Sequence, residues 1–480
     1  MTVGLVIPPS GFLLDERVFP ALGILKVAAA LEQAQVPVEV LDLSGATDLE
    51  AAVVAAVAHR RAAPEVYGIT ATMPQMPAAA AIARIIRRHQ PDSRLVLGGP
   101  HVTLLRASAR QEVQKGVEGR AIRAMRELHA RFDVLVCGDG ERAILKAIEA
   151  RPGFLVDGDD PTSTLWLTKA DLAAAPLPAR HLIDVASYRA TIEGVPAMSL
   201  IAQLGCPFGC TFCGGRRSPF LRRVRTRPTA SVLEEIAHLH QTYGCRAFMF
   251  FDDELNVSPA FGDLLQGLCD LQARLGVTFR LRGLLKAELL TDAHAALMYQ
   301  AGFRQLLVGF ESGAERILTN IEKRATIADN TACLERLHRH GMTVKALMSI
   351  GHPGESPATL QETKAWLLAV QPDDFDVTIM TVYPGTPYFD DAVLTAPDRW
   401  TYTAKSGDRL HAREVDHLVD VNFYKGAPHN YQAFVSTDTL SAAALVEARD
   451  ALEDDVRAAL RIPYPAGAAA VQFEHSMGLR

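Results

Sequence analysis

The chain has 480 residues, too many for one ordinary hydrophobic core, so two or three domains are expected. It contains 49% hydrophobic and 22% charged residues and has a net charge of −6. This is the composition of a globular protein without the positive charge that favours nucleic-acid binding. Seven cysteines are too few for a disulfide framework and indicate a reducing compartment.

The sequence opens directly with a strand-like segment, Met1-Thr-Val-Gly, and not with the basic and then apolar residues of a signal peptide. No uninterrupted apolar run reaches the roughly 18 residues that a membrane span requires. We therefore predict a cytoplasmic protein with no membrane span and no nucleic acid among its partners.

Short apolar segments alternate with helix-like segments through residues 1–150. The apolar segments are rich in β-branched residues, as expected for strands buried on both faces. They are Val3–Ile7, Val38–Leu43, Val66–Thr70, Leu95–Leu97 and Val134–Cys137. The helix-like segments between them are Leu22–Gln33, Leu49–Arg60 and Pro77–His89. This alternation predicts an α/β domain with a Rossmann-like, doubly wound parallel sheet.

The loops after these strands are candidates for ligand binding, because such sheets bind ligands at the carboxyl ends of their strands. Glycine in these loops lets the backbone approach a ligand closely, although ordinary turns use glycine equally often. The segment Leu104–Arg131, between the last two strands, predicts one or two polar helices over this edge. The candidate contacts are Pro8, Thr70, Thr72, Gly98, Gly99, Gly138, Gly140 and Glu141.

A turn-rich linker at 151–195 leads to a second alternation of strands and helices at 196–390. Six strands are expected, which indicates an open (β/α)6 partial TIM barrel with functional groups after the strands. They are Met198–Gln203, Ala247–Phe251, Phe279–Leu281, Gln305–Phe310, Thr343–Ile350 and Phe375–Thr381. In the linker, Arg180 and His181 are expected to form surface ties.

Three cysteines, Cys206, Cys210 and Cys213, follow the first of these strands with the spacing C-x3-C-x2-C. Thiolates bind iron–sulfur clusters, and a four-iron cube with three protein ligands keeps one iron open. A zinc site or three unliganded thiols are the alternatives. Structural zinc normally has four protein ligands, and no fourth cysteine or histidine follows closely. The spacing therefore favours an iron–sulfur cluster.

This loop resembles the cluster loop of radical S-adenosylmethionine (SAM) enzymes, including the aromatic Phe212 before the last cysteine. The resemblance implies a [4Fe-4S] cluster whose open iron is chelated by SAM. An electron from a reductant such as flavodoxin or ferredoxin then cleaves SAM to methionine and a 5′-deoxyadenosyl radical. That radical abstracts hydrogen from an unactivated C–H bond of a small-molecule substrate.

Other motifs of this superfamily follow later strands. Asp252-Asp253 resembles an F-x-D-D motif whose acid holds the SAM ammonium, although such aspartates also cap helices. Glu311-Ser312 lies in a G-x-E-S-G element that the resemblance places near the SAM ribose and carboxylate. Lys286 stands where relatives often carry arginine near SAM. The arginine-rich segment 215–227 is interpreted as a hydrated face paired with local acids.

The loops Leu97–Val102 and Cys137–Glu141 make residues 1–150 similar to the cobalamin-binding domain that precedes many radical SAM domains. The resemblance implies cobalamin as a further cofactor. The chain departs from the classical pattern because no D-x-H-x-x-G loop supplies a histidine to the cobalt. His101 is interpreted as a loop hydrogen-bonder and not as a cobalt ligand.

Residues 391–480 are predicted to form a small, mainly α region that acts as a substrate or cap element, with a helix at Leu440–Leu460. No catalytic residue is assigned; Tyr431 and His475 are candidates. The leading hypothesis is a cobalamin-dependent radical SAM methyltransferase that methylates an unactivated carbon of a natural-product-like molecule. The alternative is a cobalamin-independent rearrangement, dehydration, C–C bond formation or oxidation with a vestigial B12-like domain. A non-catalytic iron–sulfur or zinc interaction protein is the third.

Overall fold

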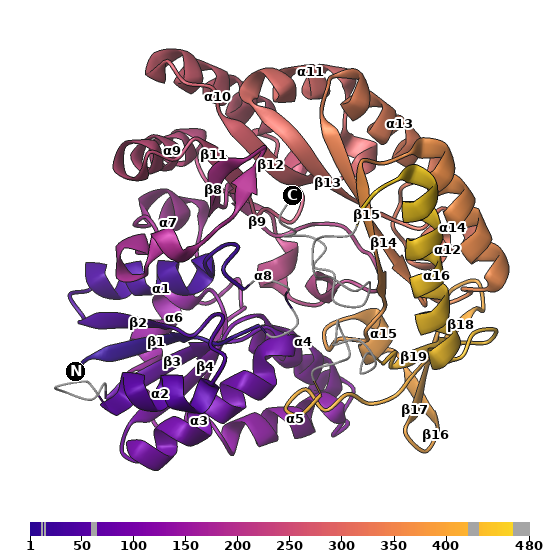
Figure 1. The fold of residues 1–480 in the computed structure, drawn as a ribbon. Coiled ribbons are helices and arrows are strands. Elements are labelled where there is room, and N and C mark those ends of the chain that lie inside the picture. Colours follow the sequence, from indigo (N-terminus) through magenta and orange to yellow (C-terminus); the bar gives the residue numbers. More distant parts are fainter. Residues whose placement is uncertain (11–12, 14–15, 59–64, 421–431, 464–480) are drawn as a thin grey trace.

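The computed structural model describes residues 1–10, 13, 16–58, 65–420 and 432–463. Two sheets form two units that lie against each other, with α8 (Pro219–Arg222) and β9 (Gln203–Leu204) between them (Figure 1). Tyr431 and His475 lie outside the described residues. No helix in the described part of the chain is long and apolar enough to cross a membrane.

The first unit is a six-stranded parallel sheet with strand order β2-β1-β3-β4-β5-β6. The strands are β1 (Val3–Ile7), β2 (Val38–Asp42), β3 (Val66–Thr70), β4 (Arg94–Gly98), β5 (Val134–Gly138) and β6 (Phe154–Gly158). The last of these lies in the segment 151–195. The order of the strands, with β1 inside the sheet, confirms the doubly wound Rossmann-like arrangement.

Helices cover both faces of this sheet, which explains why its strands are almost wholly apolar. One face packs against α1 (Leu22–Gln33) and α6 (Gly140–Ala147). The other face packs against α2 (Leu49–Ala58), α3 (Met76–His89), α4 (Pro100–Gln114) and α5 (Arg120–His129). The last two helices are the pair predicted between the last two strands.

The second unit is a seven-stranded sheet with the order β15-β14-β13-β12-β11-β8-β7. All neighbours are parallel except β7 (Thr191–Ile192), which pairs antiparallel with β8. The parallel strands are β8 (Val195–Leu200), β11 (Ala247–Phe250), β12 (Arg280–Leu285), β13 (Phe303–Glu311), β14 (Thr343–Ile350) and β15 (Asp374–Ile379). They form the predicted open (β/α)6 partial barrel.

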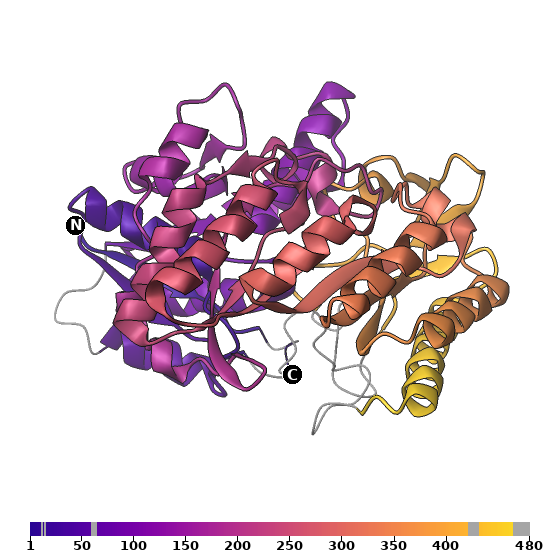
Figure 2. The same cartoon turned by 90° about the horizontal axis from the view of Figure 1, so that it is seen from above.

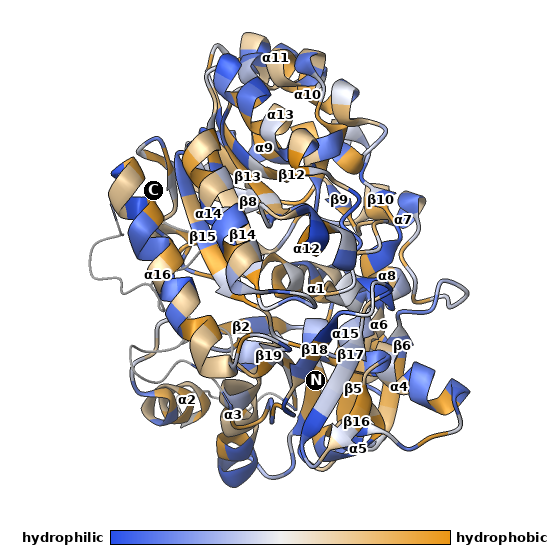
Figure 3. Cartoon of the chain, turned by 90° about the vertical axis from the view of Figure 1, so that its right-hand side faces the viewer, coloured by the Kyte–Doolittle hydropathy of each residue, from blue (hydrophilic) through white to orange (hydrophobic). Residues whose placement is uncertain are grey.

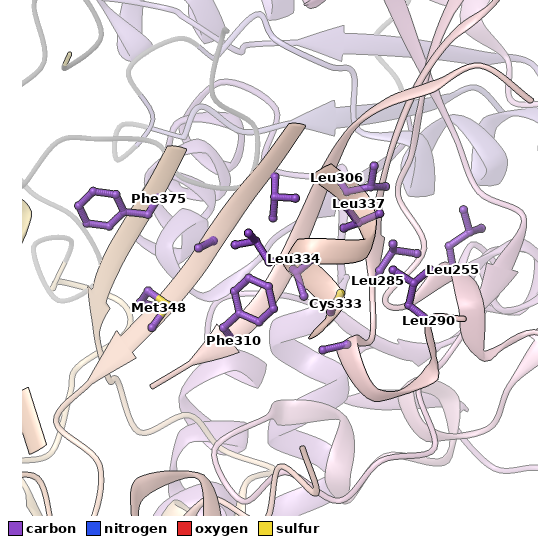
Figure 4. Close-up of a cluster of buried hydrophobic side chains, with 14 of the residues drawn as sticks. Leu255, Leu285, Leu290, Leu306, Phe310, Cys333, Leu334, Leu337, Met348 and Phe375 are labelled. Atoms are coloured by element: carbon purple, nitrogen blue, oxygen red, sulfur yellow. The ribbon is translucent and has the colours of Figure 1, made fainter. Parts of the chain in front are cut away.

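A row of helices packs on the outer face of this sheet and closes its hydrophobic core (Figure 2). They are α9 (Thr229–Tyr243), α10 (Phe261–Leu275), α11 (Asp292–Ala301), α13 (Ile327–Arg339) and α14 (Pro357–Val370). Figure 4 shows Leu306, Phe310 and Met348 of the strands beside Leu334 and Leu337 of α13. Short elements complete this unit: α7 (Lys169–Ala174), β10 (Arg225–Thr226), α12 (Glu315–Asn320) and α15 (Pro387–Asp390).

The C-terminal region contains one long helix, α16 (Ala442–Leu460), near the predicted position. It also contains a four-stranded antiparallel sheet, which the sequence pattern did not indicate. The strands, in spatial order, are β16 (Val393–Ala396), β17 (Arg399–Thr403), β18 (Arg409–Ala412) and β19 (Val435–Thr437). Figure 3 shows α16 beside α14 and β15, with hydrophobic and hydrophilic residues along its length.

Helix α16 closes the open edge of the partial barrel, because its side chains pair with the free backbone groups of β15. Arg449 Nε donates to the Val377 carbonyl over 2.9 Å, and the Val377 amide donates to Glu453 Oε1 over 2.7 Å. Arg457 donates to the Phe375 carbonyl and forms a 2.7 Å ion pair with Glu453. Unpaired edge groups otherwise invite pairing with another chain.

Buried polar contacts hold the carboxyl ends of the two sheets together. Asp139, after β5, forms a 2.5 Å ion pair with Arg225, which follows the cysteine loop. Asp159, after β6, accepts hydrogen bonds of 2.7 Å from the Ser218 hydroxyl and the Phe220 amide. Arg180 of the linker is buried against Glu235 at 2.8 Å, and so is not the expected surface tie.

Replacing Arg457 by leucine should lower the free energy of unfolding by about 3 kcal/mol, because the variant leaves a buried carboxylate, that of Glu453, without its closest cation. Urea denaturation followed by circular dichroism measures the change. The control is Lys364→Ala, which removes the exposed pair with Asp455 and should cost less than about 1 kcal/mol. Equal effects of the two variants would contradict this role of α16.

Candidate functional site

The cysteine loop begins at the end of β9 and is held by backbone contacts on several sides. Gly205 has φ +83°, and a Cβ there would lie 2.3 Å from the Arg223 carbonyl oxygen, so glycine is required. The Cys206 amide donates to the Leu221 carbonyl over 2.9 Å, and the Thr211 amide donates to the Ile321 carbonyl over 2.9 Å. The loop therefore has a fixed path before any metal binds.

The environment of the three thiols suits a cluster that brings its own positive charge. Burial raises the pKa of Cys206 to about 11 and that of Cys213 to about 12, and it also raises the pKa of Cys210. Iron displaces the thiol protons when it binds, because thiolate is the ligand form. Among the described residues, no group of three or more His, Cys, Asp or Glu side chains is arranged to hold a single ion.

Two of the three acids after β11 differ sharply in their environment. Asp252 is buried and accepts hydrogen bonds from the backbone amides of Ala202 (3.1 Å) and Gln203. Burial raises its pKa to about 7, and the two amides oppose that rise. Its carboxylate therefore fixes the strand end that leads into the cysteine loop. Asp253 is exposed and interacts with the Gly205 backbone, which leaves it open to a ligand.

Glu254 was not singled out as a site residue, yet its Oε2 is buried without a hydrogen-bond partner among the described residues. Burial raises its pKa to about 7, while Lys323 and Lys286 lower it. A buried acceptor of this kind requires a donor, and a ligand cation can supply one. The sequence signal was present, since Glu254 directly follows the two aspartates.

Glu311 stands at the end of β13 with φ +66°, where the register with β14 shifts. Its Oε1 forms a 2.9 Å ion pair with Lys323, and its Oε2 accepts from the Ser349 hydroxyl over 2.9 Å. Lys323 lowers the pKa of this carboxyl despite burial. Glu311 is therefore a fixed anion at a strand end, where a strained backbone often marks a functional position.

The other two candidates of the barrel have different partners. Lys286 is buried, donates to the Lys323 carbonyl over 2.9 Å and forms a 2.9 Å ion pair with Glu288. Its ammonium lies 4.7 Å from the ring centre of Phe208, within the cysteine loop. The Ser312 hydroxyl contacts Thr363 at 3.1 Å and caps the Ala314 amide, so it shapes the turn.

A cavity of about 270 Å³ lies at the carboxyl edge of the first sheet. Six of the predicted contacts line it: Thr70, Gly98, Gly99, Gly138, Gly140 and Glu141. Ile201, Leu204 and Phe220 of the second unit also line it. The cavity therefore reaches Leu204, which directly precedes Gly205 and the cysteine loop. Pro8 and Thr72 do not line it; both are held by Gln75 instead.

Glycines shape this cavity, and two of them were missed by the sequence analysis. Gly68 lies inside β3, where a Cβ would be 2.8 Å from Leu5 Cδ2. Gly23 lies in the first turn of α1, where a Cβ would have no atom within 4 Å. Glycine inside a strand or helix usually marks a close approach or an open space, and this signal was available.

The remaining walls are apolar apart from Thr103, Asp139 and the ion pair Lys26–Glu141 at 2.5 Å. Among the residues that the structure describes, no histidine lines the cavity. His101 is buried beside His417, with ring centres 5.6 Å apart, and burial lowers its pKa to about 3. The glycine-lined cavity is mostly apolar, as ligand pockets usually are, and its described lining residues offer no imidazole to a metal.

The arginines between 215 and 227 are largely paired within the chain, as the sequence indicated. Arg216 contacts Glu322 at 3.1 Å, and Arg217 contacts Asp391 at 2.7 Å. Arg222 donates to the Phe208 carbonyl over 2.8 Å. Arg227 pairs with Glu235 at 2.6 Å.

A three-cysteine loop on a partial barrel, beside a glycine-lined cavity on a Rossmann-like sheet, defines an enzyme with a metal cluster and a second cofactor-binding domain. The model of the Radical SAM superfamily matches residues 200–367, and that of the B12 binding domain matches residues 16–129. The chain is therefore a radical SAM enzyme with a B12-binding domain. A [4Fe-4S] cluster and SAM are the cofactors of the radical SAM domain, and cobalamin is that of the B12-binding domain.

Curated relatives and a solved structure agree with this assignment. An uncharacterized methyltransferase of Pyrococcus horikoshii is 26% identical over 82% of this chain and 83% of its own length. An anaerobic magnesium-protoporphyrin IX monomethyl ester cyclase of Cereibacter sphaeroides is 25% identical over 69% of this chain, but this covers only 54% of the cyclase. The fold matches the radical SAM methyltransferase TsrM of Kitasatospora setae with a TM-score of 0.67 and 19% identity, over 95% of this chain and 90% of TsrM.

Replacing Asp252 by asparagine should lower the free energy of unfolding by about 1–3 kcal/mol, because the amide group cannot accept both backbone hydrogen bonds. Asp253→Asn is the matched control and should change it by less than about 0.5 kcal/mol. Thermal unfolding of the cluster-free proteins measures both. A stable Asp252→Asn variant would overturn the structural role of Asp252.

Proposed function

We propose that the protein is a cobalamin-dependent radical SAM methyltransferase that methylates an unactivated carbon of a small, natural-product-like molecule. The observation that carries this proposal is the cavity shared by the two units. Its lining joins Gly98, Gly99 and Gly138 of the first unit to Leu204, next to the start of the cysteine loop. Two cofactors bound at these places would lie side by side.

In this proposal Cys206, Cys210 and Cys213 hold the [4Fe-4S] cluster, which supplies the electron that cleaves SAM. Asp253 and Glu254 accept hydrogen bonds from the SAM ammonium, since both carboxylates retain acceptor capacity beside the loop. Glu311, with Ser312 shaping its turn, binds the SAM ribose. Lys286 lies against Phe208 and keeps positive charge beside the cluster. Asp252 contributes by fixing the strand end.

Cobalamin would carry the methyl group. The cavity residues would bind and orient it: Gly23 leaves open space at the wall, and the Lys26–Glu141 pair would provide a polar anchor. The described lining residues include no histidine that would ligate the cobalt. Pro8 and Thr72 lie outside the cavity lining, where Gln75 hydrogen-bonds to both. They remain proposed cobalamin contacts at the outer rim of the cavity.

The domain division stays part of this proposal: a cobalamin domain at 1–150, a linker at 151–195, the radical SAM core at 196–390 and a cap at 391–480. The cap contacts the cobalamin domain, because Arg120 of α5 stacks on Trp400 of β17 at 3.8 Å. Arg120 also stacks on Phe389 of the core at 3.8 Å. We further propose that the enzyme acts in the cytoplasm with a flavodoxin or ferredoxin as reductant and does not act on nucleic acid.

The relative named as a cyclase favours a second candidate function. In that alternative the enzyme catalyses a cobalamin-independent rearrangement, dehydration, C–C bond formation or oxidation. The three-cysteine loop would act as described, and the cavity would be vestigial. Cobalt retention separates the two candidates.

Replacing Cys206, Cys210 and Cys213 together by alanine should abolish both bound iron and the formation of 5′-deoxyadenosine from SAM, because no thiolate remains to hold the cluster. Anaerobic reconstitution, iron analysis and chromatography of the nucleosides measure this. Cys269→Ala removes a thiol elsewhere and should change neither quantity. SAM cleavage by the triple variant would contradict the radical SAM mechanism in this chain.

Replacing Gly23 by leucine should weaken cobalamin binding at least about tenfold, because the side chain would extend into the cavity without disturbing the folded chain. Cobalt analysis and absorption spectra after reconstitution with hydroxocobalamin measure binding. Gly262→Leu is the matched control: Gly262 is also the second residue of its helix, has no atom within 4 Å of a Cβ and lies outside the cavity. Wild-type protein without cobalt would favour the cobalamin-independent alternative.

A further inference from the structure

Three polar side chains, Ser349, His352 and Tyr388, form one continuous hydrogen-bonded chain behind Glu311. The Ser349 hydroxyl donates to Glu311 Oε2 over 2.9 Å. Ser349 Oγ lies 2.8 Å from His352 Nε2, and His352 Nδ1 lies 3.2 Å from the Tyr388 hydroxyl. The chain thus runs from β13 through β14 to α15.

This chain is shielded from solvent. Ser349, His352 and Tyr388 are 5%, 0% and 1% exposed. Burial lowers the pKa of His352 to about 4, so the imidazole is neutral at physiological pH. The neutral ring carries one N–H and one bare nitrogen.

The hydrogen-bond donors among Ser349, His352 and Tyr388 can point in only one direction. Glu311 is ionised beside Lys323 and can only accept, so the Ser349 proton points to Glu311. Ser349 Oγ must then accept from His352 Nε2–H, which leaves Nδ1 as the acceptor for the Tyr388 hydroxyl. Every proton is directed toward the carboxylate.

Glu311 depends on such support because its backbone is strained at φ +66°. Its carboxylate lies over Gly309, where a Cβ would be 2.7 Å from Oε1. Lys323 holds Oε1 and Ser349 holds Oε2. Each oxygen keeps a lone pair for a further donor, so a ligand hydroxyl can bind without displacing either support.

We propose that Tyr388 and His352 are positioning residues for SAM, which fix the Glu311 carboxylate through Ser349 for the ribose hydroxyls. This inference rests on the proposed role of Glu311 in SAM binding. It assigns a function to the histidine of Gly351-His-Pro-Gly-Glu355 and to Tyr388 of α15. Phe212 of the cysteine loop packs on His352, with ring centres 5.3 Å apart, so the same imidazole also supports the loop.

The test compares SAM affinity in Tyr388→Phe, Ser349→Ala and the double variant. Tyr388→Phe keeps the ring and removes the terminal donor, and we expect SAM binding about threefold to tenfold weaker. Ser349→Ala should weaken it by a similar or larger factor. The double variant should bind SAM no more weakly than Ser349→Ala alone, because Tyr388 acts only through Ser349. Anaerobic equilibrium dialysis of the reconstituted protein measures each dissociation constant.

Tyr402→Phe is the matched control, since it removes a phenol hydroxyl next to Tyr388, with ring centres 4.8 Å apart, but outside the chain. It should leave SAM affinity unchanged. Iron content and melting temperature verify that each variant folds and holds its cluster. A His352→Gln variant keeps a donor near Ser349 but loses both the link to Tyr388 and the contact with Phe212, so it should bind SAM at least as weakly as Tyr388→Phe.

The Glu311→Gln variant distinguishes the proposed role of Glu311 in SAM binding from the positioning role of His352 and Tyr388. If Glu311→Gln binds SAM as the wild type does, the proposed role of Glu311 is wrong and the inference is wrong with it. If Glu311→Gln weakens binding while Tyr388→Phe does not, or if the Tyr388→Phe and Ser349→Ala effects add, only the positioning role is overturned.

Discussion

The structure depends on one constraint, the meeting of the two carboxyl edges across buried ionic contacts. Asp139 and Arg225 form this junction between β5 and the segment after the cysteine loop. Burial raises the pKa of Asp139 to about 6, although the Arg225 charge opposes that rise. Both charges are buried, so the loss of either partner would leave the other uncompensated. Asp139 also lines the shared cavity, so this junction and the cavity have a residue in common.

Charge around the cysteine loop is balanced rather than uniformly positive. Lys286 and Lys323 favour the Cys210 thiolate, whereas Glu254 and Glu311 disfavour it. Positive charge beside an iron–sulfur cluster stabilises its reduced form, and the net charge tunes its potential. The two glutamates therefore have opposing consequences: they offer acceptors to a cationic ligand, and they make an isolated cluster harder to reduce. A bound cation that neutralises them would ease reduction.

Much of this arrangement could be predicted because buried parallel strands have a strong local pattern. The bounds of Val3–Ile7 and Val66–Thr70 are those predicted, and the cysteine spacing located the loop without any three-dimensional information. The cavity walls could not be assigned in full, since the position of Gly23 over the sheet depends on which face α1 covers. The link from Glu311 to Tyr388 joins residues distant in sequence, so no local pattern indicates it. The exposed strand Val393–Ala396 has no burial pattern to detect.

The covering of β15 by α16 makes the last helix a condition for the solubility of the barrel. A chain that ended before this helix would keep every strand and every site residue described above, yet it would expose the amide and carbonyl of Val377 and the carbonyl of Phe375. Two such chains could join edge to edge through these strands. If a truncated chain without α16 aggregates, the cause would therefore be the uncovered edge of β15 and not a failure of the barrel to fold.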